Sequence, residues 1–194
     1  VLQHLDRGIA FREERLRGDR DDFIAANQLT ELLLRRSKWT GQLNDARRAF
    51  ELSAGSLKSA PLDLNSAGAL VHGRACLAMH RFAEARDSAK ALIAFNPHKA
   101  SSHLLLADAL LEPGHLNAAS EALAAADERG AGELSVSARR SRLAWLAGKL
   151  VPAREAMEPA LAAAKALGGE STEHVMWCLV QLGELHIRCG GFAQ

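Results

Sequence analysis

The side chains that could do acid–base or metal chemistry are scattered along the chain and form no catalytic pattern. The segment GDRDD supplies three carboxylates, Asp19, Asp21 and Asp22, but it lacks the glycine and the distant glutamate of a calcium-binding loop. Acidic residues in this arrangement instead indicate the start of a helix, since they stabilise its positive end. Glu112 and Asp108 could form an acid–base pair, but charged helix faces of this kind are far commoner than catalytic pairs.

Motifs for nucleotide binding, metal binding and nucleophilic catalysis are also missing. The chain contains no G-x-x-x-x-G-K-[ST], G-x-G-x-x-G, H-E-x-x-H, G-x-S-x-G or S-x-x-K segment. Cys76, Cys178 and Cys189 show no C-x-x-C spacing and are expected to be reduced or packed thiols. The eight histidines never form an i, i+4 pair, and those at packing positions, such as His72 and His186, are expected to be structural. The sequence therefore predicts a protein that is not an enzyme and that needs neither metal nor cofactor.

Composition limits the remaining classes. The chain has 194 residues, of which 48% are hydrophobic, so it can bury a core as one domain or as a stack of small units. Its formal net charge of +1 provides no overall field to attract nucleic acid, which is not expected as a partner. No apolar run approaches the roughly 18 residues that span a bilayer, and no signal peptide opens the chain. A soluble protein is expected, in the cytoplasm or, if a leader precedes Val1, in the periplasm.

The elements that must position these side chains repeat along the sequence. In LVHGRACLAMHRFAEARDSAKALIAFNP, Gly73 stands inside an apolar helical run, where glycine costs about 1 kcal/mol relative to alanine. A small residue returns at Ala107 and again at Ser141, and the two steps along the chain are equal, at about 34 residues. After an apparent extension of eight residues the pattern restarts with Gly183 as the small residue. A residue kept small on a fixed period indicates a close contact that is made repeatedly.

A second series of small residues keeps the same phase in the helix that follows. Ala85, Ala119 and Ala153 are separated by the same step, so three consecutive units agree without a gap. We interpret the two series as the facing positions of two helices, A and B, whose backbones cross closely.

Turn residues mark the ends of these helices. Gly114, Gly148 and Gly190 each follow the small helix-A residue by seven positions, where a left-handed glycine would end the helix. Pro97 is expected to stop a helix B before the next unit begins.

A period of about 34 residues built from two helices resembles the tetratricopeptide repeat (TPR). The chain is similar to the Ala- and Arg-rich bacterial members, of which LVQLGELHIRCGGF is a typical unit opening, and the resemblance extends from about Asp21 to Gln194. It implies an all-α fold, a right-handed α-solenoid of antiparallel helix pairs that winds as a superhelix. An ordinary bundle of Ala-rich helices is the alternative.

The repeat register predicts one solenoid domain made of six segments. Neither end has the polar character of a terminal cap, so we expect the chain to be part of a longer protein. The expected segments are 1–22 as the helix-B-like end of a preceding repeat, 23–65 as a repeat with a longer first helix, 66–99, 100–133, 134–175 with an extension, and 176–194 as a partial repeat.

The resemblance also implies which helix-A residues face an inner, concave groove. Trp145 beside Arg142 is the expected anchor for a partner, because an aromatic residue beside an arginine is the usual make-up of a binding hot spot. Alternatively, Trp145 packs against the neighbouring repeat and the arginines are solvated. The first unit contributes Asn27, Gln28, Glu31 and Leu34, and the main groove set is Leu70, Arg74, Leu77, Leu104, Asp108, Leu111, Arg139, Arg142, Trp145, Glu184 and Arg188.

Two functions fit this description. The first is a non-catalytic protein–protein interaction scaffold that binds a peptide or helix of a partner protein in the groove. The second is a regulatory or self-assembly segment of a larger multidomain protein, which docks on its own catalytic domain or on a second copy through its open ends.

Overall fold

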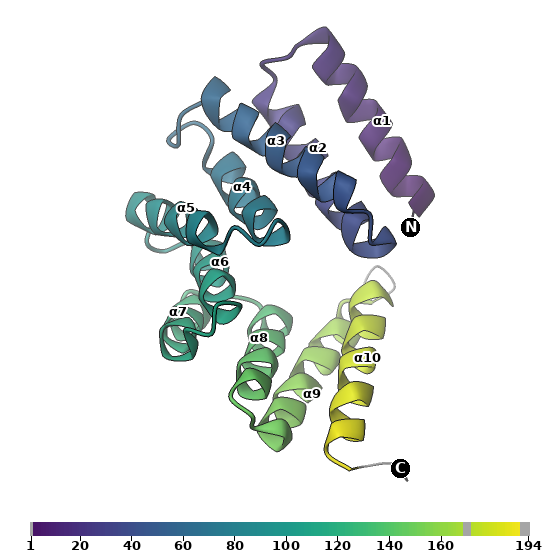
Figure 1. Cartoon of the computed structure of the whole chain (residues 1–194), viewed down its shortest axis with the longest axis vertical. Helices are drawn as coiled ribbons and strands as arrows, with labels where there is room; N and C mark the ends of the chain where they lie inside the picture. Colours follow the sequence, from purple (N-terminus) through teal and green to yellow (C-terminus); the bar gives the residue numbers. More distant parts are fainter. Residues whose placement is uncertain (1, 169–171, 191–194) are drawn as a thin grey trace. The chain divides into compact units, whose positions relative to one another are not determined.

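The described elements of this computed structural model are all helices (Figure 1). The structure describes residues 2–168 and 172–190, so part of the expected extension before the last repeat, and the end of the partial repeat 176–194, lie outside the described residues. The expected all-α class is confirmed. The helices are α1 (Leu2–Gly18), α2 (Phe23–Thr40), α3 (Leu43–Ser59), α4 (Ser66–Ala78), α5 (Phe82–Phe95), α6 (Ala100–Leu111), α7 (Leu116–Glu128), α8 (Glu133–Leu146), α9 (Leu150–Ala166) and α10 (Thr172–Arg188).

The chain divides into two compact units, Val1–Pro97 and His98–Gln194. Unit 1 holds α1 to α5 and unit 2 holds α6 to α10. Within each unit consecutive helices pack on one another, and alternate helices also touch, α2 on α4 and α6 on α8. In each unit the helices therefore form pairs, and the first helix of one pair packs beside the first helix of the next, as α2 does with α4 and α6 with α8.

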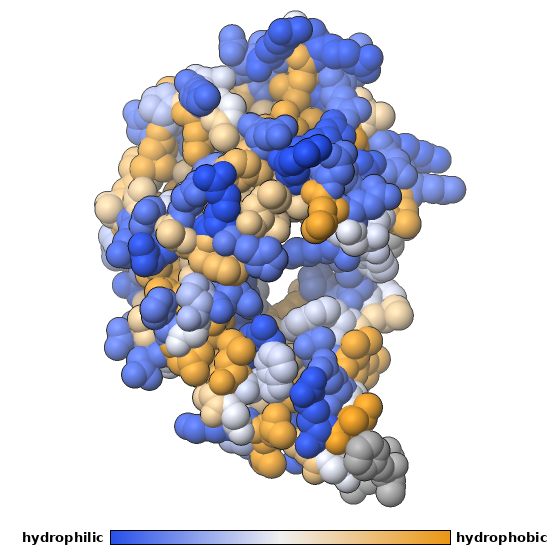
Figure 2. All heavy atoms as spheres, in the orientation of Figure 1, coloured by the Kyte–Doolittle hydropathy of each residue, from blue (hydrophilic) through white to orange (hydrophobic). Residues whose placement is uncertain are grey.

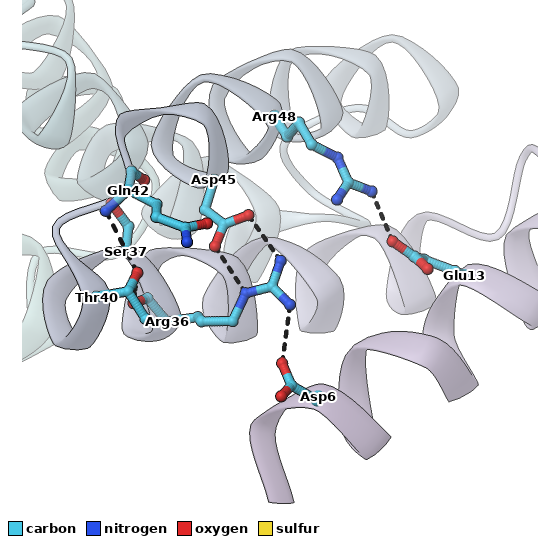
Figure 3. A network of polar contacts seen from close by, with 8 residues as sticks. All are labelled: Asp6, Glu13, Arg36, Ser37, Thr40, Gln42, Asp45 and Arg48. Carbon is cyan, nitrogen blue, oxygen red and sulfur yellow. Dashed lines mark hydrogen bonds and ion pairs between the residues drawn. The ribbon is translucent and has the colours of Figure 1, made fainter. Parts of the chain in front are cut away.

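Unit 1 is held at its start by ion pairs that fasten α1 to the two helices after it (Figure 3). Arg36 of α2 donates to both carboxylate oxygens of Asp45 at 2.7 and 2.8 Å and to Asp6 of α1 at 2.9 Å. Arg48 of α3 donates to Glu13 of α1 at 2.6 Å. Asp45 is buried, so its two bonds from Arg36 supply the partner that a buried carboxylate needs.

The GDRDD segment begins a helix, as its acidic residues predict. Asp22 is the N-cap of α2, and its Oδ1 accepts a hydrogen bond of 2.8 Å from the backbone N–H of Ala25. This N–H, helped by the guanidinium of Arg15, holds the pKa of the Asp22 carboxyl below its usual value. The Asp22 carboxylate of this segment therefore caps a helix.

A buried polar network joins α2, α3 and the start of α4. Asn27 donates to Asn65 at 2.7 Å, Ser56 donates to Asn27 at 2.7 Å, and Asn65 donates back to the Ser56 hydroxyl at 2.9 Å. Asn65 also caps α4 through the N–H of Gly68, where a Cβ would collide with the Asn65 amide. The expectation that Asn27 faces a partner is wrong, because its amide is buried and committed to this network.

The close crossing of helix pairs is present where the small residues predict it. Ala107 and Ala119, in α6 and α7, are both fully buried. In the next pair Ser141 of α8 is buried and donates a hydrogen bond of 2.7 Å to the carbonyl of Ala153 in α9. A hydroxyl can reach the backbone of the neighbouring helix only if the two helices lie close together. Gly183 differs, since it is exposed and a Cβ there would meet no atom within 4 Å.

The turns between paired helices use the left-handed conformation expected of their glycines. Gly114, Gly148 and Gly190 have φ values of 86°, 75° and 81°. In the pair that contains Gly73, the same place is taken by His80, with φ 55°. Histidine is one of the few residues other than glycine that occurs at such angles with any frequency, and the sequence offered no signal for it.

Several helices begin at or next to the positions where repeats were expected to begin. α2, α4 and α6 begin at Phe23, Ser66 and Ala100, where units were expected to open, and α8 begins one residue before Leu134. α10 begins at Thr172, four residues before the expected start at Met176. Glu173 favours the earlier start because an acidic residue stabilises the first turn of a helix. The division into repeats itself remains a prediction.

Replacing Ala119 by Leu is expected to destabilise unit 2. The side chain is fully buried at the contact between α6 and α7, so added methylene groups must displace packed atoms. We expect a loss of about 1–3 kcal/mol in the free energy of unfolding, measured by urea denaturation. Ala118→Leu, at an exposed position one residue earlier in the same helix, should change stability little. Equal stability of the two variants would contradict the assigned crossing.

Candidate functional site

The first helices of unit 2 are joined by an ordered set of charged side chains. Arg139 of α8 donates two parallel hydrogen bonds to Asp108 of α6, at 2.7 and 2.6 Å. A third bond of 2.9 Å goes from Arg139 to the carbonyl of Ser135. Bidentate arginine–carboxylate pairs are directional as well as strong, so the Arg139 side chain is held in one position across two helices.

The next turn of α8 carries the aromatic residue that the sequence singled out. Arg142 lies 3.5 Å from Glu112 and places its guanidinium 4.3 Å from the centre of the Trp145 ring. Arg188 of α10 approaches the same ring at 5.6 Å. Both separations are in the range of cation–π attraction. Trp145 therefore lies beside two guanidinium groups that come from different helices.

Trp145 also packs inward. Its ring contacts the buried cluster of unit 2 that contains Met157, Ala160, Cys178 and Leu182, and the residue is half-buried. The packing of Trp145 against neighbouring helices, one of the two alternatives for this residue, is therefore present, and its role as an anchor for a partner stays a prediction.

Seven residues form one connected surface, which we name the Trp145 surface. Glu184 belongs to it because it accepts hydrogen bonds of 3.1 and 2.9 Å from Arg188. The surface contains three carboxylates and three guanidinium groups, so it has no net charge. Its members are Asp108, Glu112, Arg139, Arg142, Trp145, Glu184 and Arg188.

The two leucines that the sequence predicted beside this surface, Leu104 and Leu111, differ in how deeply they are buried. Leu104 is half-buried and packs at the edge of the cluster formed by Ala107, Leu123 and Val136. Leu111 is only 3% exposed, so the expectation that it faces a partner is wrong. Its position at the end of α6 turns it into the core, where an apolar side chain is most stable.

Unit 1 carries a smaller set of the expected residues. Arg74 of α4 donates a hydrogen bond of 2.5 Å to Glu31 of α2, which links the two first helices of this unit. Leu70 and Leu77, on the same helix as Arg74, are half-buried. Leu34 is buried in the core of unit 1, so it is not available to a partner as expected.

The histidine and cysteine side chains of unit 1 have structural surroundings. His72 lies between Ser53, 2.9 Å from Nδ1, and the Cys76 sulfur, 3.5 Å from Nε2. Burial lowers the pKa of His72 and raises the pKa of the Cys76 thiol to about 11. Both shifts favour the uncharged form of the group. In residues 2–168 and 172–190 no three His, Cys, Asp or Glu side chains are placed to hold a metal ion.

Comparison with known proteins gives a result at the level of structure. No protein-family model matches the chain, and no curated protein matches it in sequence. Among solved structures, YrrB, described as a TPR protein with an unusual peptide-binding site, is 15% identical with a TM-score of 0.56, covering 84% of this chain and 79% of YrrB. TTC0263, a thermophilic TPR protein of Thermus thermophilus, is 21% identical with a TM-score of 0.63 and 84% coverage of each chain. This chain folds as a TPR-type helical repeat protein.

A third neighbour has the same architecture. MamA from Desulfovibrio magneticus RS-1, from its residue 41 to its end, is 18% identical with a TM-score of 0.61, covering 85% of this chain and 88% of that one. At such identities the likeness concerns the fold. In the predicted repeats α2, α4, α6, α8 and α10 are the first helices, and these are the helices that carry the Trp145 surface and the Arg74–Glu31 pair. In the part of the chain that the structure describes, no helix is both long and apolar enough to cross a membrane.

Replacing Asp108 by Asn is expected to weaken unit 2 by about 1 kcal/mol, because it removes a half-buried, bidentate ion pair between α6 and α8. Urea denaturation measures the loss. The matched control is Asp127→Asn, which breaks the more exposed Asp127–Arg140 pair and should change stability by less than about 0.5 kcal/mol. If both variants lose the same amount, the Asp108–Arg139 pair does not organise this face.

Proposed function

We propose that this protein is a non-catalytic protein-interaction module whose Trp145 surface binds a peptide or helical segment of a partner protein. The observation that carries the proposal is the indole of Trp145 beside Arg142 and Arg188. An aromatic ring whose position is set by packing and by neighbouring arginines can contact a partner at little cost in conformational entropy. We assign Leu70, Arg74 and Leu77 the same role in unit 1.

The charges of the Trp145 surface indicate what a partner would offer. Arg139 is committed to Asp108 by two short bonds, whereas Arg142 is 3.5 Å from Glu112 and both of these side chains are more than one-third exposed. Arg142 can therefore exchange its partner most readily. We expect the bound segment to place an apolar side chain on Trp145 and a carboxylate or backbone carbonyl on Arg142.

Peptides selected against the chain from a displayed library should bind through this surface. Calorimetric titration of a selected peptide is expected to show at least tenfold weaker binding to Trp145→Ala and to Arg142→Gln. Arg140→Gln is the matched control, since Arg140 lies on the same helix but pairs with Asp127 of α7. Binding that is unchanged in Arg142→Gln and Trp145→Ala would overturn the groove proposal.

A second candidate function, self-assembly, is favoured by the outer face of α10. Leu182 and Leu185 are buried, whereas an apolar stripe on another face of the helix is exposed at Met176, Leu179 and Val180. Figure 2 shows hydrophobic atoms gathered where Figure 1 places α10. Such a stripe is typical of a helix that packs against a second helix. The alternative proposal is therefore a regulatory or assembly segment that docks through this face, with a second copy of the chain as the partner.

Light scattering across a concentration series tests this alternative. If α10 mediates self-association, the mass should rise above the 20.9 kDa of one chain, and Leu179→Asp should return it to that value. Leu179 is 50% exposed, so the charge can be solvated in the monomer. Leu185 is unsuitable because it is buried. Leu64→Asp, at a position 70% exposed in unit 1, is the control and should leave the association unchanged. A constant monomer mass for the parent would exclude this function.

A further inference from the structure

Unit 1 contains a pocket of about 550 Å³ that shares no residue with the Trp145 surface. It lies between the second half of α1, the start of α2 and the second half of α3. The floor is apolar and includes Leu16, Phe23, Leu29 and Leu52. A volume of this size is in the range of sites that hold small organic ligands.

The pocket is open at Gly55, a residue in the interior of α3. A Cβ at this position would meet no atom within 4 Å, so the glycine is not required by packing. Glycine is also a poor helix former, and its backbone here does not need the left-handed region. The helix would tolerate a larger residue at this position, but its side chain would occupy part of the pocket.

The rim of the pocket is basic. Three arginines, Arg17, Arg20 and Arg48, line it together with two glutamates, which gives the lining a net charge of +1. Arg48 is held by Glu13 at 2.6 Å. Within residues 2–168 and 172–190, Arg17 forms an ion pair only with Glu14 on the surface of α1, and this highly exposed contact contributes little to stability. Among the described residues Arg20 has no ion-pair partner, so two guanidinium groups beside an apolar floor can accept a new anion.

We propose that this pocket binds a small amphipathic carboxylate, a molecule with an aliphatic body and one anionic head. The body would lie on Leu16, Phe23, Leu29 and Leu52, and the carboxylate would be bound by Arg17 and Arg20. An apolar floor favours the aliphatic part by burial, and the arginine rim selects an anion over a neutral molecule of the same shape. Nothing in this assignment depends on the protein partner proposed above.

Decanoate is the probe, and isothermal titration is the measurement. The parent should bind one decanoate per chain, and decanol, which lacks the charge, should bind at least tenfold more weakly. The double variant Arg17→Gln, Arg20→Gln should weaken decanoate binding at least tenfold. Arg47→Gln, an exposed arginine of α3 outside the pocket, is the matched control and should bind as the parent does.

Gly55→Leu separates binding in the pocket from binding elsewhere. This variant should fold, with thermal stability equal to or above that of the parent, and should lose decanoate binding because the leucine fills the pocket. Trp145→Ala should bind decanoate as the parent does, so the result is independent of the Trp145 surface. Decanoate binding that persists in Gly55→Leu, or equal binding of decanol and decanoate, would overturn the proposal, as would the absence of binding to the parent.

Discussion

The close crossing of two helices at small side chains holds this fold together. Ser141 can donate a hydrogen bond to the Ala153 carbonyl only because neither side chain separates the helices, and Ala107 and Ala119 are fully buried at their contact. A close-packed interior has no room for a larger residue there. The crossing is made twice in unit 2, between α6 and α7 and between α8 and α9, and Asp108 of α6 pairs with Arg139 of α8 across the first helices of these two pairs.

In unit 1 a buried network of hydrogen bonds holds the helices together in addition to their apolar packing. Asn27, Ser56 and Asn65 satisfy one another in a buried network, and a buried amide left without its partner would cost about 1–3 kcal/mol. Directional bonds of this kind hold α2, α3 and α4 in a single arrangement. The same arrangement buries Asn27, and Ser56 of the network also lines the pocket beside Gly55.

Charged side chains give the two candidate binding regions different characters. On the Trp145 surface most arginines are already paired, so a partner must compete for them and specificity would come from shape and from the indole. At the pocket of unit 1, Arg20 has no ion-pair partner in the described part of the chain, and an anion would meet an available charge. The first region suits a macromolecular partner with an extended contact, and the second suits a small anion.

The helical class, the repeat period, the helix start at the GDRDD segment and the left-handed turns at Gly114 and Gly148 could all be predicted from the order of the residues. These features depend on local backbone chemistry and on the size of single residues, and both can be read directly from the sequence. The burial of Leu111 and Leu34, the use of His80 in place of a glycine and the early start of α10 became visible only in the folded chain. The same is true of the partners of Arg142 and of the pocket beside Gly55. Exposure and pairing depend on how segments far apart in the sequence pack together, and no local pattern encodes that.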